Sequence, residues 1–585
     1  MTLYQVTQST DNGNGDTVGT LSYAIRQANV NAGTDAIELK TNVRIISVMK
    51  ALPDSDIVVI GNGKTVSGDA NNNGQTDDKD VRPFFIKSGN VSFSDLTITN
   101  STAKGGDSGF GGGGAGMGGG MFIYDGNVSV SNVTFSNNRA QGGSSENKSG
   151  STGGGGMFGN GGFAGGGGGG GGGGLFGSST GSSGAYGGSG NYRSGSDDFG
   201  NGGNGGYRGG GGNGGFGGGG GQSDQGVSDG NGGNGGFGGG AGAGGGGRRS
   251  NGGNGGYGGG GGRKGINDGS NGYGGYGTST NILRLGSTAG AGMGGAIFIR
   301  SGNLTLNSVN LNNNSASGGS GSRAPLNGKG LGGALFIMQR TTNTNGNNQG
   351  MPTTLPTVKS EGTQPTYSGN SAANNNANAF GTVNTVTDSK AGNNTIDGTN
   401  NSDNLDGGAG NDIINGQGSS DILIGGQGND TINGGTGVDI LYGGLDSDNL
   451  NGGAGNDSLI GGAGSDRFIF NSGQKFNSAS VEVDTISDFT TGTDKIALSK
   501  STFTGIDSAV GNGFSQPGEF DVVNSINLVD NVFEGLGAAN IIYNSQDRGL
   551  YYIEDGLLGG LRNPTKFATL QGNFTPTASD FVITT

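Results

Sequence analysis

Apolar residues of this chain occur in short groups separated by turns rich in glycine and asparagine. In the first 105 residues these groups are Ile57-Val58-Val59-Ile60, Phe84-Phe85-Ile86, Val91-Ser92-Phe93 and Leu96-Thr97-Ile98. Groups of β-branched and aromatic residues of this length predict short strands. In this part of the chain only Leu21 to Val30 has the spacing of a helix. The pattern therefore predicts an all-β protein with one short helix near its start.

A glycine-led phrase recurs three times further along the chain and predicts the start of a strand each time. Its copies are Gly119-Gly120-Met121-Phe122, Gly294-Gly295-Ala296-Ile297-Phe298 and Gly332-Gly333-Ala334-Leu335-Phe336. After the first two copies come a second strand, at 126–130 and 302–306, and then an asparagine-rich turn. This order predicts the coils of a solenoid. We expect small glycine and alanine residues to pack inside it and asparagine side chains to form ladders at its turns.

Two of these features resemble known bacterial surface proteins. The stretch from Gly19 to Asn29 resembles the G-[ST]-L-R-x-A-I-x-x-A-N opening of bacterial right-handed parallel β-helices, with Ser22 in place of the arginine. The glycine-led phrases and the asparagine turns are similar to the repeats of polymorphic outer-membrane adhesins and pectate-lyase-like proteins. The resemblance implies a right-handed parallel β-helix, with its cap and first coils in residues 1–140 and its remaining coils in residues 290–387.

A glycine-rich insertion, residues 141–289, separates these two parts of the predicted β-helix. Its period is three in places, as in Asn231-Gly-Gly-Asn234-Gly-Gly-Phe237 and Asn251-Gly-Gly-Asn254-Gly-Gly-Tyr257. Three residues per turn is the geometry of the polyproline II helix, which glycine also adopts. The insertion is therefore either a disordered loop with regularly placed aromatic residues or a bundle of polyglycine II helices. We favour disorder, because ordering glycine has a high entropic cost and little apolar area offsets it.

From Gly398 the chain divides into eight consecutive units of nine residues. The sixth residue of every unit is an aspartate: Asp403, Asp412, Asp421, Asp430, Asp439, Asp448, Asp457 and Asp466. A degenerate unit with Asn394 in the aspartate position precedes them and is expected to act as a cap. In each unit six turn residues lead into three extended residues, of which the middle one is apolar.

One apolar residue in nine forms a core only when the units stack. Successive strands then lie on opposite sides of a flattened coil of eighteen residues. This places Asp403, Asp421, Asp439 and Asp457 along one edge and Asp412, Asp430, Asp448 and Asp466 along the other. Stacked carboxylates repel one another unless cations lie between the coils. Aspartate and glycine carbonyl oxygens are the hard ligands that calcium prefers, and they suit the stricter octahedral demands of magnesium less well. The pattern thus predicts several bound Ca2+ ions.

These units resemble the G-G-x-G-x-D-x-U-x repeats of RTX proteins, a calcium-binding parallel β-roll, here over residues 388–470. Departures at Thr399, Asn401, Gln417, Ser419 and Asp446 put individual sites in doubt, not the fold. Residues 471–585 resemble the β-rich segment that closes the roll in serralysin-type secreted proteins. The last residues, Ala578 to Ile583, are similar to an uncleaved type I secretion signal. The resemblance implies a protein that the type I secretion machinery exports to the cell surface or the medium.

Composition narrows the classes of function. The chain has no cysteine and no histidine, which excludes disulfides, the usual zinc sites, thiol nucleophiles and Ser-His-Asp triads. A net charge of −14 argues against nucleic acid and anionic lipid as partners. We find no run of about 20 apolar residues that would span a membrane and no N-terminal signal peptide.

Two functions from different classes remain open. The first is a non-enzymatic surface, matrix or adhesin-like protein stabilised by calcium, with extracellular polysaccharide or a second copy of the chain as its partner. The second is a calcium-dependent polysaccharide lyase or epimerase that uses the groove of the β-helix. Without histidine its base would be an arginine, lysine or tyrosine. Arg82, Lys87, Lys104 and Tyr124 are available, but they form no motif, and we expect them to be solvated surface residues.

Overall fold

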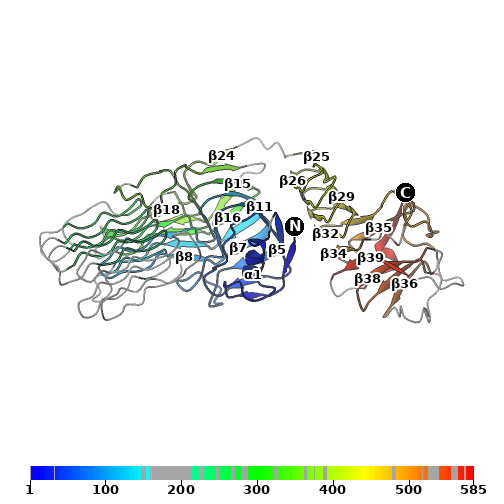
Figure 1. Cartoon of the computed structure of the whole chain (residues 1–585), viewed down its shortest axis with the longest axis horizontal. Coiled ribbons are helices and arrows are strands. Elements are labelled where there is room, and N and C mark those ends of the chain that lie inside the picture. Colours follow the sequence, from blue (N-terminus) through cyan, green and yellow to red (C-terminus); the bar gives the residue numbers. More distant parts are fainter. Residues whose placement is uncertain are drawn as a thin grey trace. The chain divides into compact units, whose positions relative to one another are not determined.

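A computed structural model describes most of the chain, and its regular structure is almost entirely β-strand (Figure 1). The described residues are 2–31, 33–145, 153–157, 160, 213–222, 230–245, 250–264, 270–278, 287–321, 326–343, 345–360, 365–374, 376–385, 392–476, 482–516, 518–524, 539–554, 564–571 and 575–585. They fold as two compact units, which we call the coil unit, residues 2–386, and the repeat unit, residues 387–585.

The coil unit starts with the one helix that the sequence predicts. Helix α1 spans Leu21–Ala28, and the Thr20 side chain caps it by accepting the N–H of Tyr23. Its apolar face is buried. Ser22, which stands where the related openings have arginine, donates from both its N–H and its hydroxyl to the Asp11 carboxylate at 2.6 Å. The helix thus closes the first end of the apolar core.

Parallel strands form four sheets in this unit. The largest contains β1 (Leu3–Val6), β2 (Thr10–Asp11), β3 (Asp35–Leu39), β4 (Val43–Ile45), β5 (Ile57–Ser67), β7 (Asn90–Thr99), β11 (Asn127–Ser136), β15 (Asn303–Asn307), β16 (Asn310–Asn312), β20 (Thr357–Ser360), β21 (Thr366–Ser368) and β24 (Asn384–Thr385). The second contains β6 (Phe84–Ile86), β10 (Met121–Ile123), β14 (Ile297–Ile299), β19 (Leu335–Ile337) and β23 (Ala379–Phe380). The third contains β8 (Thr102–Lys104), β12 (Arg139–Gln141), β17 (Ser315–Ser317) and β22 (Ser371–Ala372), and the fourth β9 (Gly116–Met117), β13 (Gly292–Met293) and β18 (Gly330–Leu331).

The three glycine-led phrases lie in register, as the solenoid pattern predicts. Each leads into a strand of the second sheet, where Phe122 pairs with Phe298 and Phe298 with Phe336. Their rings stack face to face at 5.1 Å. The predicted asparagine ladder is also confirmed, because the buried Asn138 donates its side-chain N–H to the Asn314 Oδ1 at 3.0 Å. Repeated phrases therefore mark equivalent places in successive coils.

The glycine-rich insertion leaves the coils between β12 and β13, and its described parts are ordered. We call the ranges 153–157, 213–222, 230–245, 250–264 and 270–278 the glycine bundle. The N–H groups of Gly238, Ala241 and Gly244 donate to the carbonyls of Tyr257, Gly260 and Arg263, at 2.8–3.0 Å. Every third residue thus reaches the same neighbouring segment, which is the pattern expected of polyglycine II helices. Figure 1 shows these segments as extended runs beside β18 and β8.

The expectation of disorder is wrong for these ranges, and two kinds of contact explain why. The segments lie so close that a Cβ on Gly256 would collide with the Gly236 carbonyl, so only glycine lets the backbones hydrogen-bond directly. Phe216, Phe237, Tyr257 and Tyr276 stack at 5.1–5.3 Å in a column. This column shares an apolar cluster with the phenylalanines of the second sheet. The buried apolar area is larger than the sequence indicates, because the aromatic column packs against the coils.

Two sheets form the repeat unit. One contains β25 (Thr395–Asp397), β27 (Ile413–Asn415), β29 (Thr431–Thr436), β31 (Asn449–Ala454), β33 (Arg467–Phe470), β35 (Lys495–Ser499) and β40 (Phe581–Thr584). The other contains β26 (Asn404–Ala409), β28 (Ile422–Gln427), β30 (Ile440–Leu445), β32 (Ser458–Ala463), β34 (Asp484–Ile486), β39 (Thr565–Leu570), β38 (Gly549–Tyr552), β37 (Ile541–Asn544) and β36 (Phe520–Val523).

Strands of successive nine-residue units alternate between these two sheets, as predicted. The middle residues of the units, from Ile414 to Phe468, are fully buried in one apolar cluster between them, and Leu405 packs at its edge. The end of the chain belongs to the same fold. Ala578–Asp580 form a 3-10 turn (η2), and β40 pairs with β35 and buries Phe581 and Ile583.

Candidate metal centre

The predicted aspartates form two rows, one along each edge of the stacked turns. In both rows the backbone N–H of one aspartate donates to the Oδ1 of the aspartate eighteen residues later, at 2.7–2.9 Å. One row runs through Asp403, Asp421, Asp439 and Asp457, and the other through Asp412, Asp430, Asp448 and Asp466. We call these the aspartate rows.

Both rows extend beyond the eight predicted residues. At the start, the N–H of Asn394 donates to the Asp412 Oδ1 at 2.7 Å, which places Asn394 at the head of one row. At the other end, Asp457 donates to Asp484 and Asp466 to Asp494, each at 3.0 Å. These two aspartates were not predicted as row members, although Asp484-Thr485-Ile486 and Asp494-Lys495-Ile496 repeat the Asp-x-apolar ending of a unit.

The second carboxylate oxygen of most row members is buried without a partner. Among the described residues, Oδ2 makes no hydrogen bond in six of them: Asp412, Asp421, Asp430, Asp439, Asp448 and Asp457. An unsatisfied buried carboxylate oxygen is costly. These atoms therefore need a positive group that the protein chain does not supply.

Five of these oxygens lie over the first glycine of their own unit, beside a carbonyl of the next coil: those of Asp412, Asp421, Asp430, Asp439 and Asp448. A Cβ built on Gly407 would lie 2.6 Å from both the Asp412 Oδ2 and the Gly425 carbonyl oxygen. The same convergence recurs at Gly416, Gly425, Gly434 and Gly443. The missing side chain of glycine thus leaves a small space into which one carboxylate and one carbonyl oxygen point.

Burial makes these carboxyls poor acids in the absence of a cation. It raises the pKa to about 6 for Asp421, Asp457 and Asp466, to about 7 for Asp430 and Asp439 and to about 9 for Asp448. The pKa of Asp484 is likewise raised, first by burial and then by the charge of Asp457. Without compensation, the rows therefore favour protonated carboxyls.

A hard cation fits this donor set. In the described part of the chain no three acidic side chains surround one point, so a cation would take most of its ligands from the backbone. Calcium accepts six to eight oxygen ligands in flexible geometry, including backbone carbonyls. Asp403 differs from the others, because its Oδ2 accepts the N–H of Thr399 at 2.6 Å and the hydroxyl of Thr399 at 3.0 Å. The departure at Thr399 thus changes that one site.

The four residues considered for a lyase or epimerase base are held in other contacts. Arg82 is buried, donates to the Met117 carbonyl and lies over the rings of Phe85 and Phe122, so the expectation of a solvated residue is wrong for it. Burial lowers its pKa to about 9. Cation–π contact with the rings of Phe85 and Phe122 stabilises the buried guanidinium of Arg82.

The other three residues are also engaged. Lys87 pairs with Asp54, and Lys104 pairs with both Asp78 and Asp107. The ring of Tyr124 lies 4.1 Å under the Arg300 guanidinium. The structure therefore does not bring the four together around one substrate-sized groove.

Comparison with protein families decides the nature of the aspartate rows. Residues 389–423, 415–450 and 442–474 match the model of the RTX calcium-binding nonapeptide repeat. These are RTX-type repeats. Such repeats bind calcium and are typical of secreted proteins. No curated protein matches the chain. Among the described residues, no helix is long and apolar enough to cross a membrane.

Proposed function

We propose that this RTX-type protein is a secreted, adhesin-like structural component of the cell surface or extracellular matrix, folded at its repeats by several Ca2+ ions. The observation that carries the proposal is the series of buried Oδ2 atoms without a partner, five of which lie beside a backbone carbonyl of the next coil. Ions bound there turn the repulsion within each row into attraction between coils. In this proposal the repeat unit is a calcium β-roll.

The chain's own residues would hold each ion from two successive coils. The aspartate supplies its Oδ2 from one coil, and the glycine thirteen residues later supplies its backbone carbonyl from the next coil. Asp448 and Gly461 are one such pair. Calcium supplies the positive charge that keeps the carboxylates ionised. Because the ions join coils, binding and folding of the repeats occur together.

The coil unit supports the structural part of the proposal. Its stacked parallel strands would form a right-handed parallel β-helix, and the glycine bundle adds a closely packed layer to it, with Arg263 and Lys264 as the charged residues of its described ranges. Such a surface suits contact with polysaccharide or with another copy of the chain. The engaged positions of Lys87, Lys104 and Tyr124 favour this role over a lyase, whose base must be free to reach substrate.

Export would use the end of the chain as an uncleaved type I signal. Because Phe581 and Ile583 are buried in the folded repeat unit, the signal would be read before folding. The scarcity of calcium inside cells and its millimolar level outside would delay folding until after export. A carrier protein fused to residues 471–585 and co-produced with a type I exporter should reach the medium. Retention of the fusion protein inside cells whose exporter still secretes a known substrate would contradict this part of the proposal.

Calcium binding by the full chain tests the central part. Equilibrium dialysis at neutral pH should find several ions per chain, and fewer in Asp430→Asn and Asp448→Asn variants. A chain that binds no calcium at millimolar concentration would overturn the proposal.

A further inference from the structure

The coil unit contains a second acidic loop, far from the aspartate rows in sequence, between β5 and β6. Residues 69–80 read Asp-Ala-Asn-Asn-Asn-Gly-Gln-Thr-Asp-Asp-Lys-Asp. Counted from Asp69, oxygen-bearing side chains occupy positions 1, 3, 5, 9 and 12, and a glycine occupies position 6. This is the spacing of the twelve-residue calcium loop of EF-hands, with aspartate in place of glutamate at position 12. We propose that residues 69–80 bind one calcium ion independently of the repeats.

The side chains at positions 3, 5 and 9 already converge in the structure. The Nδ2 atoms of Asn71 and Asn73 both lie 2.8 Å from the Oδ2 of Asp77. Turning each amide by half a rotation would present its oxygen to the same point, because the two ends of an amide have nearly the same shape. One carboxylate and two amides can thus supply three ligands without a change in the backbone.

Position 1 shapes the loop around this point. The Asp69 carboxylate is buried and accepts the N–H groups of Asn73, at 3.0 Å, and Gly74, at 2.7 Å. Gly74 has a φ of +72°, which glycine adopts without strain. The loop therefore makes the sharp turn at position 6 that a calcium loop requires.

Position 12 carries the observation that points to a missing ligand. Asp80 is only 6% exposed, and its Oδ1 makes no hydrogen bond. Its Oδ2 accepts the N–H of Asp77 at 2.6 Å, and its carboxylate lies close to the backbone of Ala70. The last residue of the loop thus closes over the first ones with an unsatisfied buried oxygen. Burial raises the pKa of Asp80 to about 6, and the charges of Asp77 and Asp69 add to the rise.

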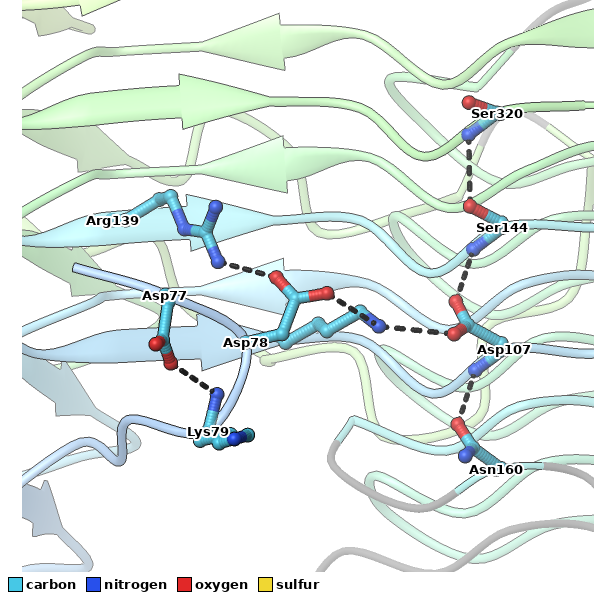
Figure 2. A network of polar contacts seen from close by, with 9 residues as sticks. Asp77, Asp78, Lys79, Asp107, Arg139, Ser144, Asn160 and Ser320 are labelled. Carbon is cyan, nitrogen blue, oxygen red and sulfur yellow. Dashed lines mark hydrogen bonds and ion pairs between the residues drawn. The ribbon is translucent and has the colours of Figure 1, made fainter. Parts of the chain in front are cut away.

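Position 10 points away from the other ligand positions and anchors the loop to the coils. Figure 2 shows Asp78 reaching Arg139 of β12, in an ion pair of 2.5 Å. Asp78 also pairs with Lys104 of β8 at 3.0 Å. The same figure shows Asp77 turned the other way, accepting the N–H of Lys79 at 2.7 Å. The two adjacent aspartates therefore differ: Asp78 anchors the loop to the coils, and Asp77 faces the side chains at positions 3 and 5. The three aspartates of the loop, at positions 1, 9 and 12, do not surround one point in the described structure, so a cation there would also need the two amide oxygens as ligands.

Peptide-resolved hydrogen exchange of the full chain, in chelator and in calcium, tests the site separately from the repeats. With a Kd of about 1 mM, as in extracellular calcium modules, ~10 mM calcium should slow exchange of the loop amides by about tenfold. Asp80→Asn should abolish this slowing while the amides of residues 398–494 still respond to calcium. Asp78→Asn, which removes the same charge from an anchoring position, should keep it.

Three results would overturn the inference. The first is equal exchange of residues 69–80 in chelator and calcium, in a chain whose repeats respond. The second is loss of the response in Asp78→Asn as well as in Asp80→Asn, which would assign it to anchoring of the loop. The third is an Asp80→Asn variant that retains the full response. A chain whose loop responds and whose repeats do not would contradict the proposed function and leave this site standing.

Discussion

At the scale of single residues, the proposed calcium binding depends on which carboxylate oxygens lack a partner inside the protein. Asp448 and Asp446 are two positions apart and illustrate the difference. Asp448 is buried with its Oδ2 unsatisfied, whereas Asp446 is exposed at a glycine position of the motif with a φ of +72°. Both are aspartates in a glycine-rich turn, so only their place in the nine-residue period distinguishes them in the sequence.

Replacing Asp448 by asparagine should have opposite effects with and without calcium. In chelator at neutral pH the Asp448 carboxyl is mostly protonated, because its pKa is about 9, so the uncharged amide should leave the variant no less stable than the parent. In calcium it loses one charged ligand and should be destabilised by about 1–3 kcal/mol. Thermal unfolding of the full chain in both conditions measures the two effects.

Asp446→Asn is the matched control, because it removes the same charge from an exposed side chain. It should unfold at the parent temperature in both conditions. If Asp448→Asn is destabilised as much in chelator as in calcium, the carboxylate acts through protein contacts and not through an ion.

At the scale of elements, the stacked turns behave as rows of coupled acids. Burial raises the pKa values of Asp421, Asp430 and Asp439 to about 6 to 7 in the folded state, above the ordinary aspartate pKa of 3.8. Between about pH 4 and pH 7 the folded state therefore binds more protons than the unfolded state, so the stability of the repeat unit falls as pH rises. Without calcium, the repeat unit should therefore become more stable as pH is lowered from 7 towards 4.

Calcium should reverse this dependence on pH, because protons then compete with the ion for the same oxygens. Unfolding of the full chain, followed across this pH range with and without calcium, should give slopes of opposite sign. Slopes of the same sign in both conditions would show that the row carboxylates do not bind the ion.

The glycine that opens each unit is a second test at this scale. A Cβ on Gly443 would collide with the Asp448 Oδ2 and the Gly461 carbonyl oxygen, so Gly443→Ala should weaken calcium binding and lower stability by about 1–3 kcal/mol. At Gly418 the nearest atom would be 3.3 Å away, and Gly418→Ala should have little effect. Calcium titration of the two variants compares them. Equal losses of calcium affinity in the two variants would mean that the space over Gly443 is not the binding site.

The glycine bundle depends on its aromatic column. Phe237 is fully buried and stacks on Phe216 and Tyr257, so Phe237→Ala should destabilise the coil unit by about 3–5 kcal/mol. Tyr273 lies in the same bundle but is 56% exposed, and Tyr273→Ala should change stability little. Thermal unfolding in calcium measures both variants. Unchanged stability of the Phe237→Ala variant would show that the aromatic column does not stabilise the glycine bundle.

At the scale of the whole molecule, sequence alone predicted what is strictly periodic. The eighteen-residue coil placed eight aspartates in two rows because every unit has the same length. Asp484 and Asp494 escaped prediction because they follow their row neighbours by 27 and 28 residues, which breaks the period. The glycine bundle escaped it because its stability depends on contacts between distant segments, such as those of the aromatic column with the coils.

The most direct test of the account is scanning calorimetry of the full chain at neutral pH, in chelator and then in millimolar calcium. We predict two unfolding transitions in calcium, one of which moves to a much lower temperature in chelator while the transition of the coil unit remains. Identical thermograms in the two conditions would contradict the central claim that calcium bound along the aspartate rows, between successive coils, stabilises the folded repeat unit.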